Sequence, residues 1–446
     1  MAFSPYRNQY IETMPIEQIK EMQLWLLKKQ LGYVLAHSPF YQRKWDEVGL
    51  RLEHIKKLDD LKNVPFTEKD ELRQSQIQNP PLGDYACVPL ENVVRVHSSS
   101  GTTGRPSFIG LTDSDKAGWT EIAARCFWCE GFRPTDKLAF AMGLGFFTGG
   151  LPPISGLEAI GVTCFPIGTG ASDRVVLTIK EMKVDSILCT PSYAIYLADW
   201  VKRRGEDPAT LGLKLISVGA ESGGGEGPMR QRIEDLWGCR VIEGCGNSDM
   251  APVYGAECPE RKGNHLVCPD FIYLELIDPE TGDSIPIEDR AEGEFVSTHL
   301  ARECNPLIRM RTHDKVKVFT EPCQCGRTGF RLKIIGRTDD MLIALGVNIW
   351  PTAVKDVITS MRPRLTGDMQ IVLKEPGPKV EPPVWIQAEY PPGTKEKDLP
   401  NLKKECEATI RERLIFSANI ELVPEGTLPK FELKSQLIRK LWESSP

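Results

Sequence analysis

Apolar positions near the start of the chain recur at helical spacing. Ile19, Met22, Leu26 and Tyr33 keep one side of a helix apolar, which predicts a helix over residues 15–44. From about residue 85 the pattern changes to short apolar runs separated by amphipathic stretches. We predict strands at 138–142, 161–165, 186–189, 214–218 and 240–243, and helices at 173–183, 192–204 and 226–237. This alternation is typical of a layered α/β domain with largely parallel strands.

The pattern changes twice more toward the C-terminus. Residues 271–277 and 293–298, with a turn at 278–282, favour antiparallel β structure. After residue 340 the pattern of apolar and polar positions is typical of a small α+β unit. We predict its strands at 369–373, 384–390 and 420–423 and its helix at 396–413. The fold class expected is therefore α/β, with layered α/β sheets and a β subdomain in residues 1–335 and an α+β unit in residues 341–446.

Composition narrows the class of protein without defining a function. A chain of 446 residues is too long for one compact core. Its 55 Lys and Arg against 61 Asp and Glu argue against a nucleic-acid binder, and no apolar run is long enough to span a membrane. The 13 scattered cysteines and the polar N-terminus favour reduced thiols in the cytoplasm over a secreted disulfide framework.

The most informative stretch is rich in hydroxyl groups and glycine and lies between two strand-like runs, 93–96 and 108–111. Glycines let backbone N–H groups approach an anion, and hydroxyls add further donors. No Gly-Lys-Ser/Thr follows at Walker spacing, so the alternatives are a different phosphate loop or a flexible polar turn. The candidate phosphate-binding residues are Ser98, Ser99, Ser100, Gly101, Thr102, Thr103 and Gly104.

Residues 98–107 resemble the phosphate-binding loop of the adenylate-forming superfamily, which includes the acyl-CoA synthetases. The rest of the chain is similar, in the same order, to the phenylacetate–coenzyme A ligase family. The resemblance implies an enzyme that uses ATP to turn a carboxylic acid into an acyl-adenylate and then passes the acyl group to coenzyme A. It also implies that the C-terminal domain is mobile and swings about a hinge at 336–340, centred on Asp339.

Further stretches carry the resemblance, and each has a structural alternative as a core strand or a glycine-rich turn. Residues 146–150 resemble the segment beside the acyl pocket, 218–221 the strand end that packs on adenine, and 243–249 the adenine and magnesium motif. Asp314 resembles the aspartate that grips the ribose hydroxyls, and Arg337 a nucleotide contact. The implied nucleotide residues are Gly219, Ala220, Glu221, Glu243, Gly244, Cys245, Gly246, Ser248, Asp314 and Arg337. The implied acyl-site residues are Phe146, Phe147, Thr148, Gly149, Ala220 and Gly246.

Catalysis in the family depends on a cation near the C-terminus and on a magnesium acid. Lys434 resembles the catalytic lysine, although Leu433 stands where glycine is usual, and Lys430 is the nearest rival. Asp249 resembles the magnesium ligand but replaces the usual glutamate, and Cys245 replaces the usual aromatic residue. His313 occupies a variable position, where we expect a solvated side chain, and a pH-sensitive contact is the alternative.

Four residues form a candidate metal site. Thiolates and imidazole suit tetrahedral zinc, and Cys258, His265, Cys323 and Cys325 supply such a set. Cys-x-Cys is tighter than the usual zinc spacing, so buried free thiols with a surface histidine are the alternative, and Cys268 is a substitute ligand. The expected zinc is structural and pins the β region together.

The cofactors expected are thus ATP, Mg²⁺, coenzyme A and structural Zn²⁺. The expected partner is a small carboxylic acid, aryl or otherwise apolar, because Phe146 and Phe147 are followed by the apolar run 151–154. Three alternatives stay open: an adenylate-forming amide synthetase, a carrier-protein acyl ligase, and a nucleotide-binding relative without chemistry. A homodimer is left open as the assembly.

Overall fold

The computed structural model describes residues 3–98, 107–221, 224–225, 227–338, 341–344, 347–375, 378–429 and 436–442, with only the backbone of 347–348. The chain divides into two compact units. The first comprises Met1–Cys189, Leu211–Ala220 and Ile242–Lys333, and the second Thr190–Thr210, Glu221–Val241 and Ile334–Pro446. The second unit therefore includes two segments from the middle of the chain, and the predicted boundary at 336–340 stays a prediction.

The N-terminal helical region is interrupted, whereas the sequence pattern predicted one helix. It contains α1 (Gln9–Glu12), α2 (Ile16–His37) and α3 (Pro39–Asp46). Ser38 is extended, and its Oγ accepts a hydrogen bond from the N–H of Tyr41, which caps α3. A residue before proline is disfavoured in the helical conformation, so Pro39 ends α2 and begins α3.

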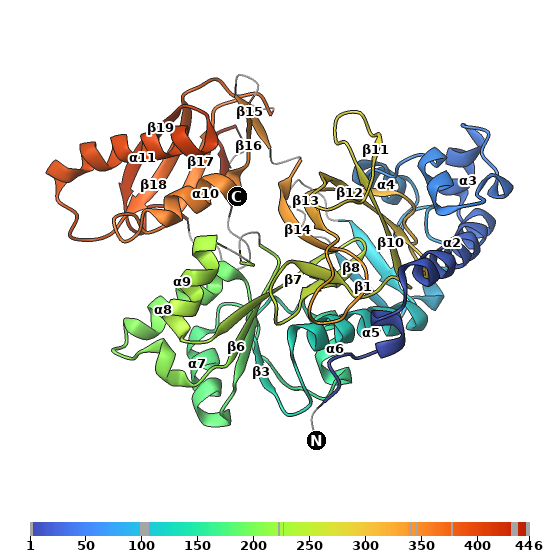
Figure 1. Cartoon of the computed structure of the whole chain (residues 1–446), viewed down its shortest axis with the longest axis horizontal. Coiled ribbons are helices and arrows are strands. Elements are labelled where there is room, and N and C mark those ends of the chain that lie inside the picture. The colour runs from blue at the N-terminus through green and yellow to red at the C-terminus, as the bar shows by residue number, and fades with distance from the viewer. Residues whose placement is uncertain are drawn as a thin grey trace. The chain divides into compact units, whose positions relative to one another are not determined.

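One sheet of twelve strands runs through the first unit (Figure 1). Its order is β11-β10-β12-β13-β14-β9-β8-β7-β6-β5-β3-β4, and β4, β3, β5 and β6 pair in parallel. The predicted α/β layers and β subdomain are thus one continuous sheet, joined at β7 (Arg240–Asn247). The parallel strands are β3 (Lys137–Phe140), β4 (Thr163–Pro166), β5 (Ser186–Cys189) and β6 (Leu215–Val218). The others are β8 (Ala251–Glu257), β9 (Asn264–Leu266), β10 (Ile272–Ile277), β11 (Ser284–Ile285), β12 (Glu292–His299), β13 (Met310–Phe319) and β14 (Arg331–Arg337).

A separate hairpin of β1 (Arg95–Ser98) and β2 (Phe108–Leu111) confirms the strands predicted on either side of the phosphate loop. The helices of the first unit after α3 are α4 (Lys69–Gln78), α5 (Asp113–Glu130), α6 (Leu151–Ala159) and α7 (Ser172–Met182), with short 3₁₀ turns η1 (Leu52–His54), η2 (Leu58–Asn63) and η3 (Leu90–Asn92). Helix α5 packs on α6 and on β8 and is buried along its C-terminal half.

The second unit has its own hydrophobic core, as the predicted α+β unit requires. Its sheet has the order β19-β18-β17-β20, with β17 (Met369–Leu373), β18 (Val384–Tyr390), β19 (Ala418–Pro424) and β20 (Ile438–Lys440). The hairpin β15 (Leu342–Ala344) and β16 (Val347–Ile349) precedes α10 (Pro351–Ser360), and η5 (Glu396–Asp398) leads into α11 (Leu399–Leu414). The unit also contains α8 (Pro191–Lys202), α9 (Gly227–Trp237) and η4 (Pro208–Leu211), although the last residue of η4 lies in the first unit. Helices α8 and α9 are joined by a hydrogen bond, which the indole N–H of Trp237 donates to the carbonyl of Ala194 at 2.9 Å.

Among the residues described, none of the helices combines the length and the apolar character needed to cross a bilayer.

The contact of α5 with α6 depends on the absence of a side chain at Gly156. A Cβ there would lie 2.4 Å from the Cβ of Ala123 and 2.9 Å from its backbone carbon. Gly32 in α2 has space for a methyl group, because a Cβ there would lie 3.5 Å from Leu52 Cδ2, an ordinary van der Waals distance.

We therefore predict opposite effects for two glycine-to-alanine changes. Gly156→Ala lowers the free energy of unfolding by about 1–3 kcal/mol, because it overpacks the α5–α6 contact. Gly32→Ala raises it by up to about 1 kcal/mol, because alanine is the better helix former. Thermal denaturation followed by circular dichroism measures both, and equal midpoints for the two variants would contradict the packing argument.

Candidate active site

The base of the phosphate loop lies against the predicted acyl segment. Ser98 ends β1 and pairs with Phe108 of β2, so the loop begins and ends at one place. The N–H of Ser98 donates to the carbonyl of Phe146 at 2.9 Å, and Ser98 forms a backbone bridge with Phe147. Of the predicted loop, Ser99, Ser100, Gly101, Thr102, Thr103 and Gly104 lie outside the described residues.

The acyl segment is tied in turn to the predicted magnesium motif. The hydroxyl of buried Thr148 donates to the Oγ of Ser248 at 2.9 Å. Phe146 is 61% exposed, so its ring is open to solvent beside the loop base. The apolar run that follows, 151–154, begins α6, and Pro152, Pro153 and Ile154 are buried where α6 packs on α5. That run serves the core of the first unit, and the acyl segment proper is 146–149.

The predicted adenine segment begins where β6 ends. The N–H of Gly219 donates to the carbonyl of Cys189 in β5, and a Cβ on Gly219 would lie 3.0 Å from the carbonyl oxygen of Gly244. Ala220 has φ +66°, a left-handed conformation that costs a non-glycine residue energy and clusters at functional sites. Glu221 accepts hydrogen bonds from the N–H and hydroxyl of Ser192 at 3.1 and 2.8 Å. Its carboxylate is thereby held at the start of α8.

The end of β7 brings backbone close to backbone. A Cβ on Gly246 would lie 2.2 Å from the carbonyl oxygen of Pro252, so only glycine fits between these strands. Cys245 pairs with Gly255 across the strands and is 7% exposed. Burial, then the charges of Glu243 and Asp314, raises the pKa of the Cys245 thiol. Its side chain is a neutral packing group.

A short turn after β7 carries the candidate magnesium ligand. Asn247 Oδ1 accepts a hydrogen bond from the N–H of Met250 at 2.8 Å, which fixes the turn at its start. Asp249 Oδ2 pairs with Lys69 Nζ at 2.8 Å. Sequence reasoning missed Lys69, which begins α4 and precedes Asp249 by 180 residues. No local signal in its segment pointed to the site.

The predicted ribose aspartate lies on β13. Asp314 is buried, and its N–H donates to Thr312 Oγ1 at 3.1 Å. Its charge acts on Cys245, so the ribose motif and the adenine motif lie close together in the first unit. His313 is half-buried and in contact with an acid, as the alternative to a solvated side chain predicts. Its Nε2 lies 3.1 Å from Glu68 Oε2, and Glu68 also pairs with Arg311.

Three predicted residues belong to the C-terminal part of the chain. Arg337 ends β14 and is half-buried. Asp339, the predicted hinge, and Lys434, the predicted catalytic lysine, lie outside the described residues, and so do the rival Lys430 and Leu433.

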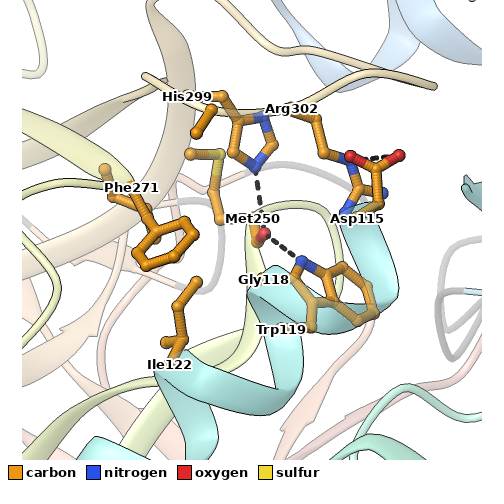
Figure 2. A pocket seen from close by; sticks show the side chains of 10 residues that line it. Asp115, Gly118, Trp119, Ile122, Met250, Phe271, His299 and Arg302 are labelled. Atoms are coloured by element: carbon orange, nitrogen blue, oxygen red, sulfur yellow. Dashed lines mark hydrogen bonds and ion pairs between the residues drawn. The ribbon is translucent and has the colours of Figure 1, made fainter. Parts of the chain in front are cut away.

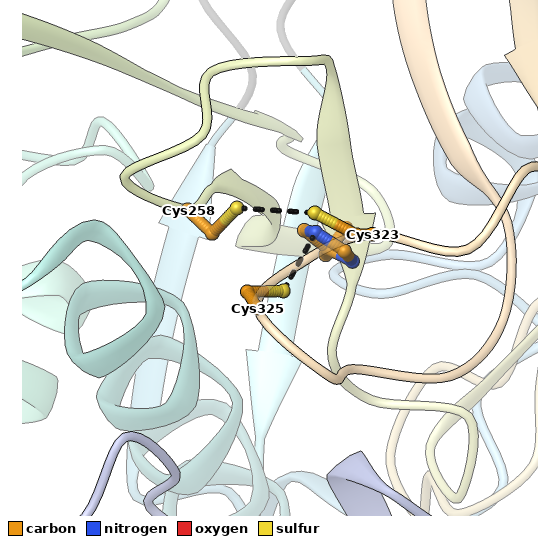
Figure 3. Close-up of side chains that lie close together, drawn as sticks. Cys258, Cys323 and Cys325 are labelled. Atoms are coloured by element: carbon orange, nitrogen blue, oxygen red, sulfur yellow. Dashed lines mark hydrogen bonds between the residues drawn. The ribbon is translucent and has the colours of Figure 1, made fainter.

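The four predicted metal ligands come together. The ligand atoms of Cys258, His265, Cys323 and Cys325 all lie within 4.8 Å of one another (Figure 3). Cys258 follows β8, His265 lies in β9, and the other two lie in the loop before β14. The Sγ atoms of Cys258 and Cys323 are 3.6 Å apart, and Cys325 Sγ is 3.4 Å from His265 Nε2. Tetrahedral zinc with Zn–S bonds of about 2.3 Å has edges of about 3.8 Å, so the set fits zinc.

The electrostatics of this cluster also favour a cation. A hydrogen bond from Cys258, followed by the contact with His265, lowers the pKa of Cys325. The contact with His265 likewise lowers the pKa of Cys323. Burial opposes a charged imidazole, but the two thiols outweigh it and raise the pKa of His265. The hydrogen bond to Cys325 raises the pKa of Cys258, so two of the three thiols are held as thiolates beside the imidazole, and zinc would displace the proton of the third.

The loop that carries Cys323 and Cys325 is anchored by the N-terminal segment. The hydroxyl of Tyr6 donates to the carbonyl of Cys325 at 3.0 Å. Arg327 pairs with Glu12 at 2.7 Å, and both side chains are buried. Because a buried charge without its partner is costly, this pair holds the first residues of the chain against the cluster.

The sequence matches known proteins over almost its whole length. The chain is 35% identical over 438 residues to a phenylacetate–coenzyme A ligase of Thermus thermophilus, which covers 95% of this chain and 96% of that protein. The chain belongs to the phenylacetate–coenzyme A ligase family. A phenylacetate–coenzyme A ligase of Pseudomonas putida is 35% identical over 432 residues, which covers 95% of this chain and 94% of that protein.

Family profiles and solved structures agree with this membership. The family described as "AMP-binding enzyme C-terminal domain" matches residues 346–440. A crystal structure of 2-hydroxyisobutyryl-CoA ligase in the postadenylation state, in complex with 2-HIB-AMP, has a TM-score of 0.92 and 30% identity. The match covers 99% of this chain and 93% of that one. The α/β fold of an adenylate-forming ligase is thereby confirmed.

The packing of Cys245 predicts that its thiol is unreactive in the folded protein. Each unit by which the pKa is raised lowers the thiolate fraction about tenfold, so alkylation by iodoacetamide at pH 8.5 is at least about tenfold slower than in guanidinium chloride. Mass spectrometry of the peptide that contains Cys245 measures the rate. Fast labelling that ATP blocks would instead place the thiol in the nucleotide pocket.

Proposed function

We propose that this chain activates an apolar carboxylic acid, with aryl acids preferred, and delivers the acyl group to coenzyme A. The two-step chemistry follows from the family: ATP and the acid give an acyl-adenylate and pyrophosphate, and coenzyme A then gives the thioester and AMP. Relatives named phenylacetate–coenzyme A ligases support an aryl acid, and so do the phenyl rings at Phe146 and Phe147.

The observation that carries the proposal is a chain of contacts through the first unit. Ser98, at the loop base, bonds the acyl segment at Phe146, and Thr148 of the same segment bonds Ser248 beside Asp249. The acyl segment therefore lies between Ser98, at the base of the predicted phosphate loop, and the turn that carries the candidate magnesium acid. A carboxylate must meet the α-phosphate of ATP between these two groups.

Four of the predicted residues have a role in the first step. A carboxylate oxygen of the substrate attacks the α-phosphorus, and pyrophosphate leaves. We assign Lys434 to the charge that develops where the two anions join, Asp314 to the ribose hydroxyls and Arg337 to the nucleotide. Asp249, whose carboxylate pairs with Lys69, would hold Mg²⁺ through its carboxylate oxygens, and the ion would supply screening of the phosphate charge.

In the second step the sulfur of coenzyme A attacks the acyl carbonyl carbon. The bond between that carbon and the AMP oxygen breaks, AMP leaves, and the thiol proton passes to solvent or to a base. We assign the hinge at Asp339 to the swing of the C-terminal domain between the two steps. Lys434 is therefore needed for the first step and is dispensable in the second.

A panel of acids tests the substrate assignment. We expect pyrophosphate release to be fastest with arylacetic or aryl acids, with kcat/KM for acetate at least about tenfold lower, because each apolar group lost from a pocket costs about this much. AMP release should depend on coenzyme A. A preference for a small hydroxy acid would contradict the aryl assignment and leave the two-step chemistry standing.

Pyrophosphate release also tests the assignment of the catalytic lysine. Lys434→Ala should nearly abolish pyrophosphate release while sparing thioester formation from preformed acyl-adenylate, and Lys430→Ala is the matched neighbour. If Lys430→Ala gives this loss and Lys434→Ala does not, the catalytic assignment moves to Lys430.

We also propose that Cys258, His265, Cys323 and Cys325 hold a structural zinc ion. Their geometry and electrostatics support this, and the cluster joins β8, β9 and the loop before β14. No disulfide joins the thirteen cysteines, all of which are described, so a reducing compartment such as the cytoplasm is the location we propose. A homodimer stays an untested prediction.

The zinc proposal predicts one zinc per chain in gently purified protein. Cys323→Ser should lose the metal and lower the melting temperature, because the loop loses a ligand. Cys164→Ser, a half-buried cysteine outside the cluster, should keep the metal. Elemental analysis measures the content, and zinc well below one per chain would end the proposal.

A further inference from the structure

The carbonyl of Met250 receives two buried hydrogen bonds. The indole Nε1–H of Trp119 donates to it at 3.1 Å, and His299 Nε2 lies 3.0 Å from the same oxygen (Figure 2). Trp119 lies on α5 and His299 ends β12, so the two donors come from separate elements. Met250 directly follows Asp249, and its own N–H bonds Asn247. Hydrogen bonds thus fix both the N–H and the carbonyl of Met250.

The contacts of His299 define its tautomer. Its Nδ1 accepts a hydrogen bond from the N–H of Leu307 at 3.0 Å, so the ring proton is on Nε2 and points at Met250. Burial, then the charge of Arg302, lowers the pKa of His299 to about 3. The imidazole is neutral at working pH, and the bond to Met250 is present throughout.

Little solvent reaches these bonds. The cavity beside them, lined by Trp119, Met250, Phe271, His299 and Arg302 among others, has a volume of about 10 Å³. This is at the lower limit for one water molecule. Hydrogen bonds in such surroundings are stronger than in water, and a carbonyl that loses them has no solvent to replace them.

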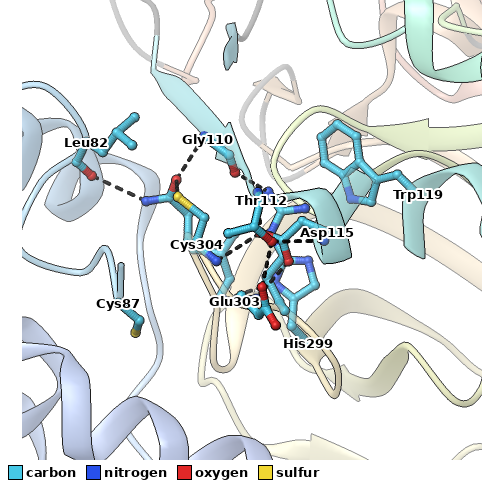
Figure 4. A network of polar contacts seen from close by, with 12 residues as sticks. Leu82, Cys87, Gly110, Thr112, Asp115, Trp119, His299, Glu303 and Cys304 are labelled. Carbon is cyan, nitrogen blue, oxygen red and sulfur yellow. Dashed lines mark hydrogen bonds and ion pairs between the residues drawn. The ribbon is translucent and has the colours of Figure 1, made fainter. Parts of the chain in front are cut away.

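The same network reaches the base of the phosphate loop. The guanidinium of Arg302 lies 4.8 Å from the centre of the Trp119 ring, and its Nη2 donates to the carbonyl of Gly110 at 2.9 Å. Gly110 lies on β2, which leaves the loop. Asp115 pairs with Arg302 and accepts N–H bonds from Thr112, Glu303 and Cys304 (Figure 4).

Resting on the proposed role of Asp249, we propose that Trp119 and His299 are positioning residues that hold the Asp249 turn for magnesium through the carbonyl of Met250. Both side chains bond the Met250 carbonyl, so their proposed action is through the backbone and not as ligands. Their effect is to fix the backbone from which the Asp249 carboxylate extends, in register with the strand that leaves the phosphate loop. Loss of either bond should weaken use of magnesium and leave thioester formation intact, because that step starts from acyl-adenylate.

The test is the magnesium dependence of adenylation by Trp119→Phe, which removes one donor and keeps a ring. Pyrophosphate release is measured against free Mg²⁺ at saturating ATP. We expect the half-saturating Mg²⁺ concentration to rise about three- to tenfold, the equivalent of one buried hydrogen bond, with thioester formation from preformed acyl-adenylate unchanged. An equal fall of both half-reactions, with half-saturation unchanged, would overturn the proposal.

Two variants of His299 give a second measurement. The amide of His299→Gln can both accept from Leu307 and donate to Met250, whereas His299→Leu can do neither. We expect the leucine variant to shift the magnesium dependence clearly more than the glutamine variant does. Equal shifts would mean that the hydrogen bonds do not matter, and would overturn the proposal.

Two further variants separate the possible failures. Trp237→Phe removes a buried indole bond of the same kind, to Ala194, in the second unit, and should leave the magnesium dependence unchanged. Asp249→Asn should shift it strongly. If Asp249→Asn does not, the proposed role of Asp249 fails, and this inference fails with it. If Asp249→Asn shifts the dependence and Trp119→Phe does not, the inference alone fails.

Discussion

Strand β7 has to satisfy two sets of neighbours at once, because it lies between β6 of the parallel half of the sheet and β8 of the antiparallel half. Its C-terminal half approaches both so closely that Gly244 faces Gly219 on one side and Gly246 faces Pro252 on the other. Backbone groups so placed cannot shift independently. The whole sheet therefore determines the position of the turn that follows, with Ser248 and Asp249. The predicted acyl segment is attached to that turn by the hydrogen bond between Thr148 and Ser248.

Buried ion pairs fix the segments that the sheet does not. Glu12 with Arg327 and Asp115 with Arg302 each join residues about two hundred or more positions apart, with side chains almost fully buried. The desolvation cost of such a pair nearly offsets its attraction, so its contribution to net stability is small. Removing one partner leaves a buried charge, which penalises every arrangement in which the two segments separate. These pairs thus favour one geometry of the loop that carries Cys323 and Cys325, and one geometry of the contacts around Asp115 at the start of α5.

The sequence was sufficient for the features that depend on local pattern. Strands 186–189, 369–373 and 384–390 are where periodicity placed them. The four candidate zinc ligands, spread over 68 positions, come together as their chemistry predicted. Local pattern could not show that the α/β layers and the β subdomain form one sheet, because pairing across β7 is a long-range contact. Lys69, Trp119 and His299 were missed because their contacts are also long-range. Lys69 and Trp119 bond residues 180 and 131 positions away, and His299 bonds one 49 positions away. Trp119 and His299 moreover bond a backbone carbonyl, which carries no sequence signal.

The two departures in the adenine and magnesium motif have physical consequences that the structure makes visible. Cys245 Sγ lies 2.5 Å from where a Cβ on Gly255 would be, so the small thiol and the glycine opposite it form a matched pair, and an aromatic side chain pointing the same way would need different packing of β8. Asp249 is one methylene shorter than glutamate and has one rotatable bond fewer. Its carboxylate is therefore placed by the backbone more than a glutamate carboxylate would be, and has less reach to correct an error. Anchoring of the Met250 peptide by Asn247, Trp119 and His299 consequently has more influence on the position of the Asp249 carboxylate than it would have on that of a longer acid.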